Sequence, residues 1–184
     1  GIWEKVESPI IPEDGGGEYY QFGRTVDIDG DMACVTKNSY GKNHYSGDVD
    51  IFRKVGGKWE HVESLSFDYV HKCHVTGNTI AVQGVYDFYI YQYDKISEKA
   101  IHVQNASATT PGLFSDSSLV IYAMSLSDSY LVVYATSNSG IESDDVIPGV
   151  FVYHRRDTNQ PFTISQRFKD SEYVGFGSSE FDEQ

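Results

Sequence analysis

A repeated hairpin pattern constrains this chain more than any other feature of its sequence. Three segments each show an apolar run, a two-residue turn and a second apolar run, at 26–35, 73–82 and 124–133. Their turns contain Asp-Gly, Gly-Asn and Asp-Ser, residues that tolerate the positive φ of tight hairpins. The aligned turn residues Gly30, Gly77 and Asp128 lie 47 and 51 residues apart. A period near 40–50 residues indicates a repeat architecture.

Each hairpin is followed by two further apolar runs, which predict a third and a fourth strand. The third strands are expected at 49–53, 88–92 and 150–154, and the fourth at 59–65, 101–103 and 162–165. Aromatic and β-branched runs between turn residues are typical of strands, and no long stretch keeps the 3.6-residue apolar period of a helix. We therefore expect an all-β fold of β-propeller blades, each with four antiparallel strands.

The two ends of the chain extend the same pattern. Residues 2–8 mirror 58–64, so the segment 1–17 is expected to hold the last strand of a preceding blade. Residues 172–178 mirror 18–24, so the segment 171–184 is expected to begin another blade. The complete blades are expected at 18–66, 67–113 and 114–170, together one partial propeller over 1–184. Closed propellers have four to eight blades, so we expect further sequence or another chain to complete the ring.

The charge and the apolar content limit the classes of partner. The chain has 14 basic and 27 acidic side chains, which give a formal net charge of −13. A field of that sign repels phosphate backbones, so we expect no nucleic-acid partner. No apolar run is long enough to span a bilayer, so we expect no membrane insertion. A protein or a carbohydrate ligand is the expected partner.

The first unit resembles an FG-GAP repeat of the integrin-α-like propeller family. The similarity lies in Phe22-Gly23, in the acidic segment 26–31 and in the segment 47–52 with the following turn at 57–59. The second unit has Tyr69-Val70 in place of Phe-Gly, and the third has Val120-Ile121. This resemblance implies a β-propeller with a binding or adhesion role at the cell surface or outside the cell, and it brings no catalytic residues.

Three carboxylates around the first turn are the candidate metal ligands. Some members of the FG-GAP family hold calcium in a longer Asp-rich hairpin loop, and Asp27, Asp29 and Asp31 occupy the corresponding place here. Alternate residues of a strand share a face, but calcium takes six to eight oxygen ligands and this turn has only two residues. Two interpretations of the three aspartates therefore stay open, a calcium site and a solvent-exposed turn without an ion. No other cofactor is expected.

Histidine and cysteine side chains gather at His71, Cys73 and His74. Zinc needs three or four converging ligands, and no further ligand is evident nearby in the sequence. Cys73 and Cys34 each align with apolar residues in the other two units. We expect both to be buried free thiols, which pack as small apolar groups; a zinc site, a nucleophilic Cys/His pair or a disulfide between them is the alternative.

The connections between the second and third strands are the candidate ligand-binding segments. They are long in the first and third units, at 37–46 and 137–146, and short in the second unit, at 84–86. Variable loops on a rigid scaffold commonly carry binding sites. The candidate residues are Tyr40, Lys42, Asn43, His44, Tyr45, Glu142, Asp144 and Asp145. Asn105 begins an Asn-Ala-Ser triplet, the pattern of a glycosylation acceptor.

The predicted function is a non-catalytic extracellular recognition or adhesion module that binds a protein or a glycan through loops on one propeller face. One alternative is a hydrolase or lyase acting on polysaccharide, with catalytic residues in a central channel. Another is a structural subunit of a larger assembly, whose acidic surface keeps it in solution.

Overall fold

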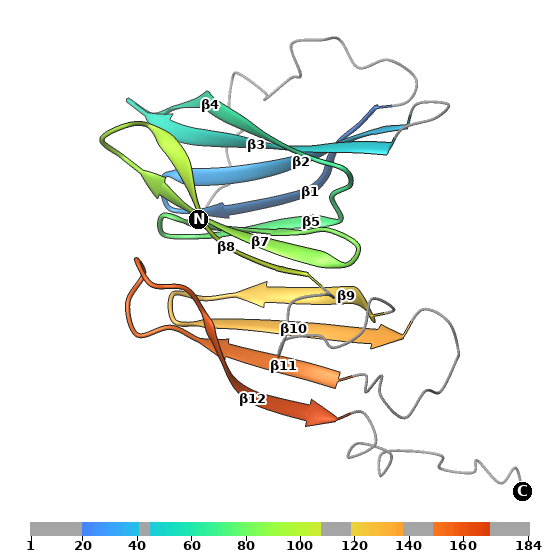
Figure 1. The fold of residues 1–184 in the computed structure, drawn as a ribbon. Coiled ribbons are helices and arrows are strands. Elements are labelled where there is room, and N and C mark those ends of the chain that lie inside the picture. The colour runs from blue at the N-terminus through green and yellow to red at the C-terminus, as the bar shows by residue number, and fades with distance from the viewer. Residues whose placement is uncertain (1–19, 41–44, 108–118, 138–148, 170–184) are drawn as a thin grey trace, which may run out of the picture.

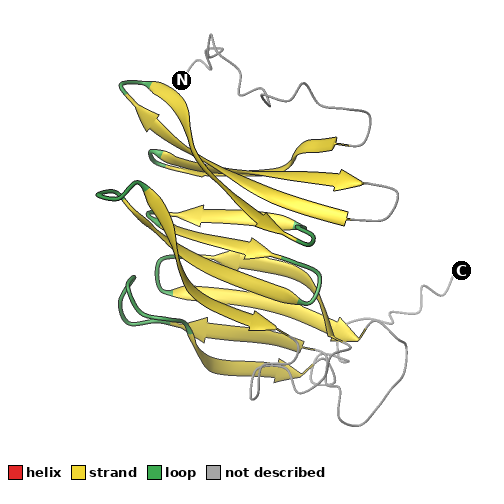
Figure 2. Ribbon diagram, turned by 45° about the horizontal axis from the view of Figure 1, so that its top comes forward, coloured by secondary structure: helices red, strands yellow, loops and turns green. Residues whose placement is uncertain are grey.

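The computed structural model describes residues 20–40, 45–107, 119–137 and 149–169, and the regular elements of this part are all β-strands (Figures 1 and 2). They form three four-stranded antiparallel sheets, in each of which strands adjacent in sequence are adjacent in space. The predicted all-β class and the predicted four-stranded units are confirmed. The expected part-blades at 1–17 and 171–184 lie outside the described residues.

The first sheet contains β1 (Tyr20–Asp29), β2 (Met32–Tyr40), β3 (Tyr45–Val55) and β4 (Lys58–Phe67). The second sheet contains β5 (Lys72–Thr76), β6 (Thr79–Gln83), β7 (Asp87–Asp94) and β8 (Lys99–Ser107). The third sheet contains β9 (Leu119–Leu126), β10 (Tyr130–Ser137), β11 (Gly149–His154) and β12 (Thr163–Lys169). The three predicted hairpins are β1–β2, β5–β6 and β9–β10.

Two of the three hairpin turns are closed by glycine. Gly30 has a φ of 60° and Gly77 a φ of 53°, and positive φ at the first central position alone is typical of a type II′ turn. The third turn differs from the prediction, because neither Asp128 nor Ser129 has a positive φ. There the Ser127 hydroxyl accepts a hydrogen bond from the Tyr130 amide at 3.0 Å. A side chain thus closes the turn that lacks glycine.

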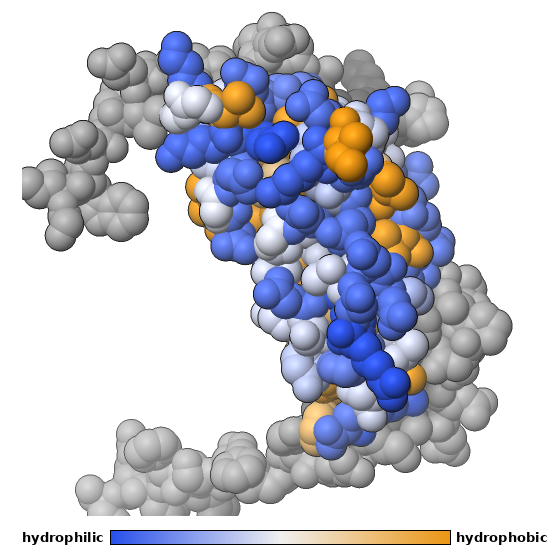
Figure 3. All heavy atoms as spheres, turned by 90° about the vertical axis from the view of Figure 1, so that its left-hand side faces the viewer, coloured by the Kyte–Doolittle hydropathy of each residue, from blue (hydrophilic) through white to orange (hydrophobic). Residues whose placement is uncertain are grey.

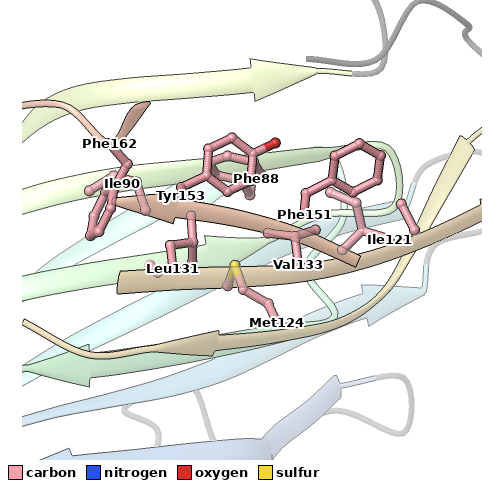
Figure 4. Packing of buried hydrophobic residues seen from close by; sticks show 11 residues of the cluster. Phe88, Ile90, Ile121, Met124, Leu131, Val133, Phe151, Tyr153 and Phe162 are labelled. Atoms are coloured by element: carbon pink, nitrogen blue, oxygen red, sulfur yellow. The ribbon is translucent and has the colours of Figure 1, made fainter. Parts of the chain in front are cut away.

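The sheets pack face against face in chain order (Figure 1). The interface of the first and second sheets buries Met32, Cys34, Val49, Ile51, Cys73, Val75, Ile80, Val82 and Tyr93, among others. The interface of the second and third sheets buries Ala81, Phe88, Ile90, Ile121, Met124, Leu131, Val133, Phe151, Tyr153 and Phe162 (Figure 4). Burying one such large apolar side chain contributes about 1.5–3 kcal/mol, so these interfaces hold the sheets together.

The strand β6 lies in the middle sheet and is covered on both faces. All five of its residues are buried, since Ile80 and Val82 face the first sheet while Ala81 faces the third. Successive side chains of a strand point to opposite faces. A strand covered on both faces therefore loses the apolar–polar alternation of a half-exposed strand.

The strands run between two ends of the stack, which differ in their connections. The hairpin end holds the turns at 30–31, 77–78 and 128–129, and it presents a mainly hydrophilic surface (Figure 3). The loop end holds the β4–β5 connection at 68–71, the β6–β7 connection at 84–86, and the strand ends that flank 41–44 and 138–148 (Figure 1). Among the described residues no helix is long and apolar enough to cross a membrane.

Candidate functional site

The candidate calcium ligands lie at the junction of the first two sheets. Asp27 accepts a hydrogen bond from the Val75 amide at 3.0 Å, and Asp29 accepts one from the Gly77 amide at 2.7 Å. The Thr25 hydroxyl accepts a third, longer bond from the Cys73 amide. The Cys73 and Val75 amides lie on the side of the edge strand β5 that its own sheet leaves unpaired, and Gly77 lies in the turn that follows β5. Alternate residues of β1 thus satisfy the edge of the next sheet.

The same carboxylates have cationic neighbours. Asp27 lies 3.4 Å from Nδ1 of His74, and Asp31 lies 3.8 Å from Arg53 and 3.5 Å from Lys95. Within the part that the structure describes, no three His, Cys, Asp or Glu side chains converge on a common metal position. Calcium stays one of the two interpretations of this turn, and the observed contacts give Asp27 and Asp29 a structural use that needs no ion.

The two cysteines are buried and free, as expected. Both belong to the interface between the first and second sheets. Burial, with Cys73 beside it, raises the pKa of the Cys34 thiol, so that thiol is uncharged at neutral pH. His71 packs edge-on against Tyr69, while His74 faces Asp27.

The predicted ligand-binding segments are seen only in part. Tyr40 and Tyr45 are cross-strand partners at the loop-end limit of β2 and β3. Lys42, Asn43, His44, Glu142, Asp144 and Asp145 lie outside the described residues. Asn105 is exposed and lies in β8, opposite Tyr89. The strand β8 is longer than the predicted 101–103, so the glycosylation triplet sits on an edge strand.

A polar and aromatic cluster occupies the described part of the loop end. Nη1 of Arg24 donates a hydrogen bond to the Tyr69 hydroxyl at 2.7 Å. The rings of Tyr69 and His71 lie 4.9 Å apart at 75°, a favourable edge-to-face geometry. Burial, together with the charges of Arg24 and Lys72, lowers the pKa of His71. His71 is therefore a neutral donor and acceptor at physiological pH.

The β6–β7 connection borders this cluster. The position of a Cβ on Gly84 lies 3.5 Å from the Tyr69 carbonyl oxygen, which puts the connection beside Tyr69. Tyr86 is 44 % exposed, and Asp87 accepts a hydrogen bond from the Tyr89 hydroxyl at 3.3 Å. Burial and the Asp87 charge raise the pKa of Tyr89 to about 12, whereas burial raises that of Asp87. The Tyr89 hydroxyl is therefore neutral at physiological pH and able to donate its hydrogen bond to Asp87.

A shallow surface pocket opens next to Arg24. Its volume is about 480 Å³, and it is lined by the β1 segment Gln21, Phe22, Gly23 and Arg24. The loop end therefore combines the exposed ring of Tyr86, the half-buried rings of Tyr69 and His71, a charged donor in Arg24 and a hollow. We refer to Arg24, Tyr69, His71, Tyr86 and Asp87 as the loop-end cluster.

The loop-end cluster was not predicted as a site from the sequence. Tyr69 stands where the second unit departs from the Phe-Gly pair of the first, and that departure was the available signal. The 84–86 connection is short, so its length does not indicate a binding loop. No model of a known protein family matches the sequence, and no curated protein matches it either.

Proposed function

We propose that the three sheets are successive blades of a β-propeller of the FG-GAP, integrin-α-like type. Three observations support this arrangement. The sheets recur at the sequence period of the turns, each is a four-stranded meander, and the first strands lie in order, with β1 beside β5 and β5 beside β9. The first strands are then the innermost strands of the blades.

We further propose that the chain is a non-catalytic recognition module, working at the cell surface or outside the cell. It binds a protein or a glycan through the loop end. The observation that carries this proposal is the loop-end cluster, in which Tyr69 contacts both Arg24 and His71. The neighbouring β6–β7 connection, which approaches the Tyr69 carbonyl at Gly84, carries the exposed Tyr86. Rigid aromatic faces next to oriented donors and acceptors are the groups that recognition surfaces use.

A neutral glycan is the ligand class that these side chains favour. Tyrosine rings offer apolar faces to the C–H side of a sugar ring, and Arg24, His71 and Asp87 offer donors and acceptors to its hydroxyls. The net charge of −13 opposes anionic polymers. The strand ends that border the predicted segments at 37–46 and 137–146 lie at the same end of the stack.

The test is binding of the purified chain to an array of defined neutral oligosaccharides, with wild type compared against Tyr69→Ala and Tyr86→Ala. Loss of about 1–3 kcal/mol of binding free energy is expected for each variant, the usual range for an anchoring aromatic residue. Ile96→Ala is the matched control, because Ile96 is 94 % exposed in the β7–β8 turn at the hairpin end.

Two results would contradict the proposal. Binding that survives both tyrosine variants unchanged would place the ligand elsewhere on the molecule. Release of new reducing ends from any bound oligosaccharide would make the chain a hydrolase, the alternative considered from the sequence.

A further inference from the structure

A pocket at the hairpin end of the third sheet lies apart from the loop-end cluster. Its volume is about 410 Å³, and it is lined by His154, Arg155, Arg156, Gln160, Pro161 and Thr163. These residues come from the end of β11, the start of β12 and the turn between them. We call it the arginine pocket. Of the described residues that line it none is acidic, although the whole chain has 27 acidic and only 14 basic side chains.

Arg155 is the buried member of this pocket, at 3 % exposure. Its guanidinium donates hydrogen bonds to the carbonyl oxygens of Asp128 and Thr158 and to the Thr79 hydroxyl. These acceptors are uncharged, and no carboxylate of the described residues forms an ion pair with Arg155. Burial lowers the pKa of Arg155, which the Asp128 and Asp157 charges oppose only in part. A buried charge is unfavourable unless an opposite charge compensates it, so the pocket has an uncompensated positive charge.

Three further side chains of the pocket have unused hydrogen-bonding groups. Those of His154, Arg156 and Gln160 make no hydrogen bond or ion pair with the described residues. The His154 ring packs against that of Tyr130, with the ring centres 4.9 Å apart. Arg156 and Gln160 supply N–H donors, and a guanidinium can donate two parallel bonds to the two oxygens of a carboxylate. The pocket therefore has the donors and the charge that an oxyanion needs.

A pocket between the first and second sheets shows how a cation at the equivalent position is compensated. Arg53 in β3 and His154 in β11 each pair with the first residue of the second strand of their sheet. Arg53 lines a pocket of about 160 Å³, and the carboxylates of Asp31 and Glu98 each lie 3.8 Å from its guanidinium. That cation thus has its counter-ions within the chain, whereas the two arginines of the arginine pocket have none among the described residues.

We propose that the arginine pocket binds the carboxylate group of a small organic acid. Arg156 donates charge-assisted hydrogen bonds to the carboxylate, Gln160 adds a neutral donor, and Arg155 contributes positive charge. The net charge of −13 does not prevent this, because exposed charges more than about 8 Å away are screened at physiological salt. It favours a singly charged carboxylate over a doubly charged phosphate. This site goes beyond the proposed glycan-binding loop end and does not depend on it.

Nuclear magnetic resonance of the whole isotope-labelled chain, titrated with sodium acetate at an ionic strength held constant with sodium chloride, tests the proposal. The amide signals of His154, Arg156 and Gln160 should shift and saturate, with a dissociation constant on the order of millimolar. Glucuronate should shift the same signals. Glucose, which has a hydroxymethyl group in place of that carboxylate, should leave them unchanged.

Arg156→Gln should weaken acetate binding at least about tenfold, because it removes the charge and keeps N–H donors. Lys58→Gln is the matched control, since it removes the same charge from an exposed residue of β4, and its acetate binding should equal that of wild type. Unchanged amide signals outside the substituted region check that each variant is folded.

Four results would overturn the carboxylate site. These are shifts that do not saturate, equal shifts with chloride alone, acetate binding that Arg156→Gln leaves unchanged, and inorganic phosphate that binds more tightly than acetate. The glycan-binding test uses neutral oligosaccharides and variants at the loop end, so failure of that proposal is distinguishable from failure of this one.

Discussion

Gly47 shows how a single missing side chain lets the β4–β5 connection pack against β3. A Cβ at this position would lie 2.6 Å from the Val70 amide nitrogen and 2.7 Å from Oδ1 of Asn38. Real Cβ atoms do not come that close to backbone atoms. Asn38 is itself held there, because its side-chain amide donates to the Val70 carbonyl at 2.8 Å.

Gly47→Ala should therefore lower the free energy of unfolding by about 1–3 kcal/mol, the usual cost of overpacking a buried site. Urea unfolding followed by tryptophan fluorescence measures the change. Ser46→Ala is the control, since Ser46 is the exposed neighbour and surface changes stay within about 0.5 kcal/mol. Equal stability of Gly47→Ala and wild type would mean that Val70 and Asn38 lie farther from Gly47 than described.

His71 sets a pH dependence at the loop end. Burial lowers the pKa of the folded His71 below its ordinary value of 6.5. Protonation then favours the unfolded chain, so the contribution of His71 to stability is present above the unfolded pKa and is lost as the pH falls through the interval down to the folded pKa. His71→Gln should lose less stability than wild type between about pH 7.5 and about pH 5. Parallel loss in the two proteins would contradict the assignment.

At the scale of elements, the junction of β1 and β5 depends on side-chain acceptors rather than on strand pairing. Asp27→Ala should lower the unfolding free energy by about 1–2 kcal/mol, because the Val75 amide is left without an acceptor. Asp27→Asn should lose less, since its amide oxygen still accepts.

Added calcium or a chelator should leave the melting temperature of wild type unchanged. A calcium-dependent rise in wild type that Asp27→Ala abolishes would instead establish the metal site considered from the sequence.

The junction of the second and third sheets depends on Arg155, which follows β11. This side chain is 3 % exposed. It donates to the Asp128 carbonyl at 2.7 Å, to the Thr158 carbonyl at 3.0 Å and to the Thr79 hydroxyl at 2.7 Å. Its guanidinium also lies 4.4 Å from the ring centre of Phe162. One cation thus joins three separate segments at the hairpin end.

Arg155→Met should lower the unfolding free energy by about 1–3 kcal/mol, because methionine keeps much of the volume but removes the charged donor of the buried Thr79 hydroxyl and of the Asp128 and Thr158 carbonyls. Thermal unfolding by calorimetry measures the loss. Arg156→Met removes the same charge from the exposed neighbouring residue and should change little. Similar losses in the two variants would show that net charge, and not the bonding of Arg155, is responsible.

At the scale of the whole molecule, local patterns predicted the sheets but not the contacts between them. Turn residues and apolar runs located the three hairpins, because hairpin formation depends on neighbours in sequence. The bonds from Asp27 and Asp29 join residues 48 apart in the chain, so only the stacking reveals them. The loop-end cluster escaped prediction for the same reason, since Arg24 and Tyr69 meet across 45 residues. The Ser127 side chain that closes the third turn could have been predicted from its residue type.

Amide hydrogen exchange at Val75, followed residue by residue by NMR, tests the stacking of successive sheets most directly. Val75 lies on the edge strand β5, and its amide is bound only if the first sheet places Asp27 against it. Slow exchange is predicted in wild type, with fast exchange in Asp27→Ala, while the amide of Ala81 in the central strand β6 stays slow in both. Exchange of the wild-type Val75 amide at the rate of an exposed edge would contradict the stacked arrangement.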